Sequence, residues 1–360
     1  MGIFLSYTYF IFLDKKKQLT PVKKILFIQS EFDFNQFFDE KIFPNRDDIE
    51  FEGIKYLNET AEYFSKYTKV YSCDYFDEYA YSIIKKAKST GVDTFLLMDG
   101  IYDWANLYVN PKWEEKKNFF DVSFYKLIYC VDSHSASYLS STGASTDVYA
   151  PSRIFNITTK DKTKKNKIIN TSKKKILITS SNTPYFDKTE FIRIINIFKS
   201  VIEWGKLNSV DIYYRIYNEK ILKELDINQE VNLTEGSIDT YLKEIDVLIT
   251  TPSSISITAA ALDKPFIHII YRDTPIAVQA AWQIFNPEMS SEVLKSALIR
   301  EENRMMHQRT IIPKMRINLE TKKINKKNED VNVVKYSSLK LFLVILKSKL
   351  KGLYYKLFKY

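Results

Sequence analysis

Val247-Leu248-Ile249-Thr250-Thr251-Pro252-Ser253-Ser254 joins an apolar run to a polar turn, and the small residues of 258–261 follow it. A short apolar run rich in β-branched residues is typical of a buried parallel strand. Pro252 suits the first turn of a helix, so we expect a helix over 254–262. A strand that ends where a helix begins is the repeating unit of a doubly wound α/β domain.

The same alternation runs through two parts of the chain. In the first part we expect strands at 23–29, 69–73, 94–98, 127–131 and 146–150, and helices at 53–67 and 79–89. In the second part we expect strands at 175–179, 210–215, 247–250 and 265–270, and helices at 188–204, 238–244 and 254–262. Units of this kind build parallel sheets with helices on both faces. The fold class is therefore predicted to be α/β, with two Rossmann-like domains.

The length of 360 residues fits two domains of ordinary size better than one core. Residues 157–174 are rich in Lys, Thr and Asn, which is typical of an exposed linker. The predicted organisation is listed here in chain order: an apolar extension at 1–22, an N-terminal domain at 23–156, the linker at 157–174, a C-terminal domain at 175–320 and a basic tail at 321–360.

The net charge of +9 lies entirely in the tail. Residues 321–360 carry eleven Lys and two acidic residues, which leaves 42 basic and 42 acidic residues in 1–320. A neutral body argues against a basic groove for nucleic acid, so no nucleic-acid partner is expected. A basic terminus is instead typical of contact with an anionic surface.

The tail also has the spacing of an amphipathic helix. One face carries apolar residues with Lys beside them, namely Leu339, Phe342, Leu343, Leu346, Leu350, Leu353, Tyr354 and Leu357. This pattern predicts a C-terminal helix in a membrane interface, with 337–360 against an anionic membrane surface. Leu341, Val344 and Ile345 interrupt the polar face, so packing on the body or on another subunit is the alternative.

Two features bear on the location of the chain. Cys73 and Cys130 lie in apolar surroundings, as ordinary buried thiols of a reducing compartment do. The apolar run within 1–22 is too short for a spanning helix and lacks the features of a signal peptide, so it is either an extra strand or an interfacial anchor. We expect a cytoplasmic protein, peripheral on the inner face of the cytoplasmic membrane.

The turn at 251–254 is a candidate phosphate site. Thr251, Pro252, Ser253 and Ser254 precede a helix N-terminus, where unpaired N–H groups and partial positive charge favour an anion. The alternative is an ordinary serine cap. The position favours a ligand, because ligands of doubly wound sheets lie at the carboxyl ends of strands. The chain has no G-x-G-x-x-G, P-loop or Asp-x-Asp motif, and we expect neither metal nor cofactor.

A second cluster, with Asp99, Gly100 and Asp103, follows the strand expected at 94–98. A carboxylate at this edge can accept a proton from an acceptor hydroxyl. Gly100 allows a sharp turn and close approach of a substrate to the backbone. The alternatives are a simple Asp-Gly turn and a helix cap at Asp103.

Two further strand ends carry polar side chains. Ser180, Ser181, Asn182 and Thr183 follow the strand at 175–179, and Arg215 ends the strand at 210–215. The hydroxyl and amide groups are expected to face a nucleotide, and Arg215 its phosphates. Turn chemistry and a surface charge are the alternatives.

The order of these motifs resembles that of bacterial GT-B surface-carbohydrate glycosyltransferases, including sialyltransferase-like and Kdo-transferase-like enzymes that use CMP-sugars. Asp99-Gly100 is similar to the end of their acidic-acidic-glycine motif, and Ser253-Ser254 to the pair that holds the CMP phosphate. Met98 stands at the first acidic position, and Arg215-Ile216 stands where a His-Pro pair is expected.

The resemblance implies two sheets that face a central cleft, and an inverting, metal-independent transfer from a nucleotide-sugar donor to a surface glycan or glycolipid acceptor. Asp99, or Asp103 in its place, would be the general base, while Ser253, Ser254 and Arg215 stabilise the departing phosphate. The alternatives are a nucleotide-sugar epimerase, a polyol-phosphate transferase of the CDP-glycerol type, and a non-catalytic GT-B-like membrane-associated protein. Surface polysaccharide biosynthesis is the expected context.

Overall fold

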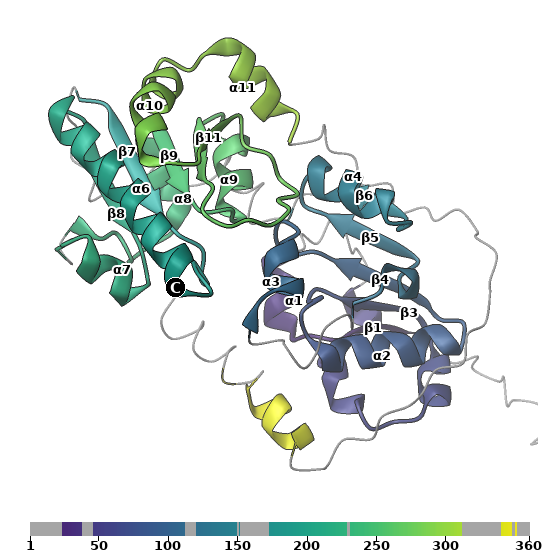
Figure 1. Ribbon diagram of the computed structural model, residues 1–360. Coiled ribbons are helices and arrows are strands. Elements are labelled where there is room, and N and C mark those ends of the chain that lie inside the picture. The colour runs from purple at the N-terminus through teal and green to yellow at the C-terminus, as the bar shows by residue number, and fades with distance from the viewer. Residues whose placement is uncertain are drawn as a thin grey trace, which may run out of the picture.

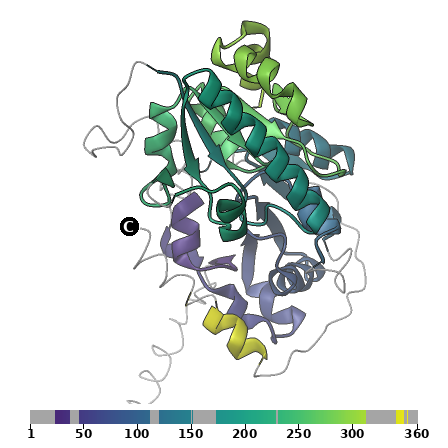
Figure 2. The same cartoon turned by 60° about the vertical axis from the view of Figure 1, so that its left-hand side comes forward.

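The computed structural model describes residues 24–37, 46–111, 120–149, 151, 173–228, 231–311, 340–347 and 350. Figures 1 and 2 show two α/β domains side by side, one coloured purple to blue and the other teal to green. The predicted extension at 1–22, most of the linker and most of the tail lie outside the described residues. The predicted domain boundaries therefore stay predictions.

The N-terminal domain contains a six-stranded parallel sheet in the order β2-β1-β3-β4-β5-β6. Its strands are β1 (Lys24–Phe27), β2 (Ile49–Glu50), β3 (Tyr67–Ser72), β4 (Asp93–Leu97), β5 (Leu127–Cys130) and β6 (Thr146–Val148). Its α-helices are α1 (Glu31–Phe37), α2 (Glu78–Ser89), α3 (Trp104–Tyr108) and α4 (Ser133–Ser141).

The C-terminal domain contains a five-stranded parallel sheet in the order β11-β10-β9-β7-β8. Its strands are β7 (Lys175–Thr179), β8 (Asp211–Arg215), β9 (Val247–Thr250), β10 (Phe266–Ile269) and β11 (Trp282–Ile284). Its α-helices are α6 (Lys188–Leu207), α7 (Glu219–Glu224), α8 (Ile238–Glu244), α9 (Ile255–Ala261), α10 (Ser290–Leu298) and α11 (Glu302–Arg309). The predicted pair of parallel α/β sheets is confirmed.

Side chains of the strands alternate between the two faces of each sheet. In β7, Ile176 and Ile178 pack with residues of α6, whereas Leu177 belongs to the cluster on the opposite face. That second cluster also includes Phe95 of β4 and Leu248 of β9, so it takes in buried side chains of both domains. The cores of the two domains are therefore continuous.

The single helix expected at 53–67 is wrong. The structure has two 3₁₀ helices there, Gly53–Tyr56 and Ala61–Lys66. The ammonium group of Lys86, a buried residue of α2, donates to the carbonyl of Leu57 at 2.6 Å and to that of Glu59 at 2.9 Å. These carbonyls are satisfied by a side chain, so the segment does not need a continuous helical ladder.

A short helix also covers 340–347 and is coloured yellow in Figure 1. It is the described part of the predicted C-terminal amphipathic helix. Among the described residues, no helix has the length and apolar character needed to cross a bilayer.

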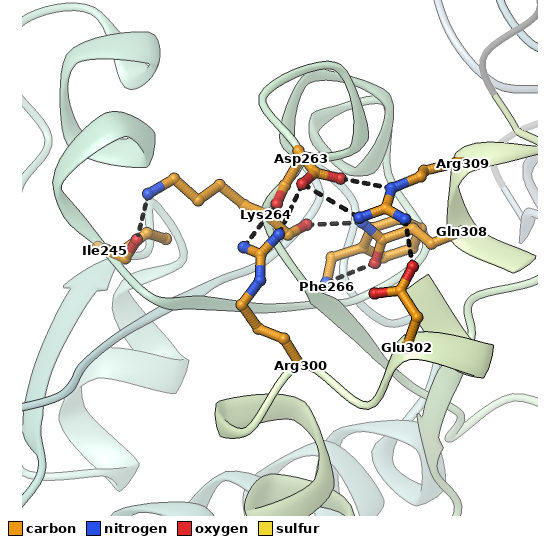
Figure 3. A network of polar contacts seen from close by, with 8 residues as sticks. All are labelled: Ile245, Asp263, Lys264, Phe266, Arg300, Glu302, Gln308 and Arg309. Carbon is orange, nitrogen blue, oxygen red and sulfur yellow. Dashed lines mark hydrogen bonds and ion pairs between the residues drawn. The ribbon is translucent and has the colours of Figure 1, made fainter. Parts of the chain in front are cut away.

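A polar network fastens α11 to the turn between α9 and β10 (Figure 3). The buried side chain of Gln308 accepts from the Phe266 amide at 3.0 Å and donates to the Lys264 carbonyl at 2.7 Å. Nearer the surface, the Asp263 carboxylate accepts from Arg300 and Arg309. The network holds the start of β10, and the strand carries part of the cleft described below.

Gln308→Met keeps the length of the side chain but leaves the Phe266 amide and the Lys264 carbonyl without their partner. We expect a loss of about 1–3 kcal/mol in the free energy of unfolding, the usual cost of unsatisfied buried groups. Urea denaturation measures it. Arg309→Met is the matched control in the same network, and it is expected to cost far less because water screens exposed ion pairs. Equal losses would contradict this account.

Candidate interdomain active site

A cleft of about 460 Å³, its open mouth included, lies between the domains. The N-terminal domain contributes the segment after β4 and the start of α3, and the C-terminal domain contributes segments after β7, β9 and β10. The lining residues are Ile101, Tyr102, Asp103, Trp104, Ala105, Ser181, Pro252, Ile269, Ile270, Tyr271, Arg272, Thr274, Pro275 and Ile276.

The topology explains this position. In the C-terminal sheet, β7 is flanked by β8 and β9. The chain therefore forms β8 on one side of β7 and later forms β9 on the other side. The loops that follow β7 and β9 therefore diverge at a topological switch point, where ligands of doubly wound sheets bind. Ser181 and Pro252 lie in these two loops. The amide of Ser181 donates to the buried hydroxyl of Thr251 at 2.7 Å, which ties the loops together.

The N-terminal wall of the cleft is braced from behind by two side chains. The Tyr75 hydroxyl accepts from the Asp103 amide at 3.1 Å, and the Ser135 hydroxyl accepts from the Tyr102 amide at 3.0 Å. Ser135 in turn donates to the carboxylate of Asp132 at 2.7 Å. Burial raises the pKa of Asp132 to about 6. Side chains of the N-terminal domain thus hold the amides of Tyr102 and Asp103 in place.

Asp103 is the carboxylate that lines the cleft. It caps α3, because its side chain accepts from the Asn106 amide at 3.0 Å. Burial raises the pKa of Asp103, while this hydrogen bond and the positive charge of Arg272 act in the opposite direction. The predicted cap and a cleft-facing carboxylate are therefore the same residue.

Arg272 is the cation that lines the cleft, and it was not among the residues predicted from the sequence. Its guanidinium makes two bonds to Glu190, of 2.7 and 2.9 Å, and both side chains are 11% exposed. The guanidinium carbon lies 3.7 Å from the centroid of the Phe186 ring. Its second terminal nitrogen, Nη1, has no acceptor among the described residues. A rigidly held guanidinium therefore keeps one edge available for a ligand.

Gly100 and Ser254 meet across the domain interface. The Ser254 hydroxyl accepts from the Ile101 amide at 3.3 Å, and it makes no capping bond to its own helix α9. A Cβ atom built at Gly100 would lie 2.0 Å from the Ser254 oxygen and 3.2 Å from its Cβ. The space left by the absent side chain of Gly100 was expected to let a substrate approach, but the Ser254 hydroxyl occupies it. The predicted serine cap is also replaced by a contact between domains.

Several predicted site residues lie outside the lining of the cleft, among them Asp99, Ser180, Asn182, Thr183 and Ser253. Asp99 is exposed and lies at the edge of the same segment that carries Asp103. Arg215 donates to the carbonyls of Leu233, Glu235 and Gly236, so its guanidinium holds this loop. Its predicted phosphate contact stays a prediction.

Asp103 was predicted from its position after the carboxyl end of a strand. Two residues that were not predicted, Asp132 and Arg272, share this kind of position. Asp132 follows β5 and Arg272 follows β10, each at the carboxyl end of its strand. Among the described residues, no three His, Cys, Asp or Glu side chains are grouped as metal ligands would be. The expected metal-independent chemistry stays a prediction.

Comparisons with family models and with curated proteins found no match. Solved structures do resemble the chain. A putative UDP-N-acetylglucosamine 2-epimerase from Listeria monocytogenes has a TM-score of 0.56 at 12% identity, covering 81% of this chain and 92% of that one. S. aureus MnaA, solved with UDP, has a TM-score of 0.54 at 18% identity, with 81% and 91% covered.

The UDP-GlcNAc 2-epimerase from Neisseria meningitidis, solved with UDP-GlcNAc, has a TM-score of 0.53 at 13% identity, with 91% and 100% covered. The chain thus has the predicted GT-B fold, with two parallel sheets on either side of an interdomain cleft. At these identities the likeness establishes the fold alone. None of these three structures is a sialyltransferase-like or Kdo-transferase-like enzyme, so the comparisons do not support that part of the resemblance.

Gly100→Ala tests the interdomain contact. The new methyl group collides with the Ser254 hydroxyl, and turning the hydroxyl away breaks its bond with Ile101. We expect a loss of about 1–3 kcal/mol in the free energy of unfolding, as for other overpacked sites. In Gly100→Ala/Ser254→Ala the nearest neighbour of the new methyl group is the Cβ atom of residue 254, at 3.2 Å, so we expect part of the lost stability to be regained. Strict additivity in this double-mutant cycle would contradict a direct contact.

Proposed function

We propose that the chain binds a nucleotide sugar in this cleft and transfers the sugar, with inversion and without a metal, to the hydroxyl of a surface glycan or glycolipid. One observation carries the proposal: the cleft joins a carboxyl of raised pKa from one domain, Asp103, to a pre-oriented guanidinium from the other, Arg272. A donor held by one domain and an acceptor presented by the other would meet between them.

Asp103 serves as the general base. Its carboxylate takes the proton of the acceptor hydroxyl as the acceptor oxygen bonds to the anomeric carbon. The bond between that carbon and the phosphate oxygen breaks, and its electron pair leaves with the phosphate. A base works best when its pKa lies near the working pH, and the burial of Asp103 shifts its pKa in that direction.

Arg272 stabilises the negative charge that develops on the departing phosphate. Its Nη1 edge offers two N–H donors, and the pair with Glu190 fixes the direction of that edge before a ligand arrives. Ser181 and Pro252 supply the neighbouring wall at the switch point. Ser253 and Arg215, which were predicted to bind phosphate, lie outside this wall and are secondary candidates.

Nucleotide-sugar epimerisation is the second candidate, favoured by the likeness to solved UDP-GlcNAc 2-epimerases. An epimerase needs no acceptor, so product analysis with donor alone separates the two reactions. A polyol-phosphate transferase of the CDP-glycerol type would require a different donor. A non-catalytic chain would bind a nucleotide without turnover.

Asp103→Asn should abolish turnover and leave the fold intact. Asn caps a helix as well as Asp does. The raised pKa means that the ionised carboxylate of Asp103 is unfavourable in the folded state. The contribution of Asp103 to the free energy of unfolding therefore falls as the pH rises through its folded-state pKa. The Asn variant is therefore expected to unfold at the same or a higher temperature at neutral pH.

Asp99→Asn is the matched control, since Asp99 lies on the same segment but outside the lining of the cleft. We expect it to retain activity. Loss of turnover in Asp99→Asn with full activity in Asp103→Asn would reverse the assignment. In the wild type, the pKa read from the acidic limb of the pH profile of kcat/KM should be higher than the ordinary pKa of Asp.

A thermal-shift panel of CMP, CDP, UDP and GDP identifies the nucleotide, because a ligand of the folded state raises the melting temperature. Arg272→Lys keeps the charge beside Glu190 but loses the planar donors, so we expect the affinity for that nucleotide to fall about tenfold or more. Arg193→Lys is the control, because Arg193 bonds the neighbouring Tyr271 carbonyl at 3.2 Å and lies outside the cleft lining. Unchanged affinity in Arg272→Lys would contradict the phosphate role.

A further inference from the structure

The C-terminal helix at 340–347 is held on the N-terminal domain by one face. Leu341, Val344 and Ile345 pack against the core cluster that includes residues of α2. The ammonium nitrogen of Lys340 lies 5.8 Å from the centroid of the Tyr79 ring, also in α2. In Figures 1 and 2 this yellow helix lies beside the N-terminal domain. The three residues that interrupt the polar face in the sequence are therefore the ones that fasten the helix to the body.

The opposite face is apolar and open. Phe342 is 60% exposed, Leu343 53%, Leu346 39% and Leu350 55%. These residues fall within nine positions of one another, whereas other large exposed apolar side chains, such as Leu207 and Ile299, lie on separate helices or turns. Clustered exposed apolar residues rimmed by polar ones mark interaction sites. The helix is thus fixed by one apolar face and presents another.

Charge identifies the partner. Lys340 and Lys347 are exposed beside the open face, and the 321–360 segment carries eleven Lys against two acidic residues. We propose that this face docks on a membrane surface of anionic lipids, with Phe342, Leu343, Leu346 and Leu350 in the interface and the Lys side chains at the headgroups. A second copy of the chain is disfavoured as occupant, because two segments of this charge repel each other.

The inner contacts give this docking an orientation. Because Leu341, Val344 and Ile345 hold the helix on the N-terminal domain, a bilayer that receives the outer face lies against that domain. Asp103 belongs to the same domain, so the domain that carries this carboxylate would be the one nearer the lipid surface. The proposal does not depend on which reaction the cleft performs.

Flotation of the full chain with vesicles of equal parts phosphatidylglycerol and phosphatidylcholine tests the proposal. We expect binding that weakens as salt screens the charges. Phe342→Gln/Leu346→Gln introduces Gln, which is a good helix former, and leaves every Lys in place. Because it removes two apolar side chains from the open face, it should lower vesicle binding about tenfold or more. Leu207→Gln/Ile299→Gln removes two exposed apolar side chains elsewhere, 85% and 77% exposed, and should bind as the wild type does.

Circular dichroism and the melting temperature establish that both variants fold. Three results would overturn the proposal: equal flotation of Phe342→Gln/Leu346→Gln and the wild type, equal binding to vesicles of phosphatidylcholine alone, or a dimer that these two substitutions convert to a monomer. The last result would assign the face to a second copy of the chain.

Discussion

The contact of Gly100 with Ser254 sets how closely the two sheets approach at the cleft. Both residues lie beyond the carboxyl ends of parallel strands, where loops of the two domains face each other. Any side chain at Gly100 would fill the space that the Ser254 hydroxyl occupies. Asp103 lies three residues after Gly100, and Pro252 lies two residues before Ser254. The geometry of the proposed site therefore depends on a contact that involves no ligand.

Close approach also produces the electrostatics of the cleft. Water is displaced from Asp103 on the N-terminal side, and the same exclusion strengthens the bond between Arg272 and Glu190. Pairing Arg272 with Glu190 reduces its net attraction for an anion. In return, the guanidinium keeps one orientation, so binding a phosphate requires little reordering of the side chain.

The strand pattern predicted most of the fold, because buried parallel strands require apolar runs. The rule that ligands lie at strand ends also predicted the segments that carry Asp103, Ser181 and Pro252. It did not predict side-chain direction: Arg215 ends β8 but turns to the carbonyls of another loop. Arg272 also follows a strand end, but the contact that fixes its side chain joins it to Glu190, 82 residues away in sequence. Neither contact leaves a local signal.

Helix capping explains why Asp103 is difficult to assign from sequence. Asp77, Asp132 and Asp187 also cap helices through their side chains, so this chain commonly uses Asp where a strand or loop leads into a helix. An aspartate in this position is accounted for by its cap alone. What distinguishes Asp103 is that its cap faces the interdomain cleft opposite Arg272, where burial raises its pKa. A cap accepts Asn as readily as Asp, whereas a general base requires the ionisable carboxyl, so only the second role demands the residue that is present.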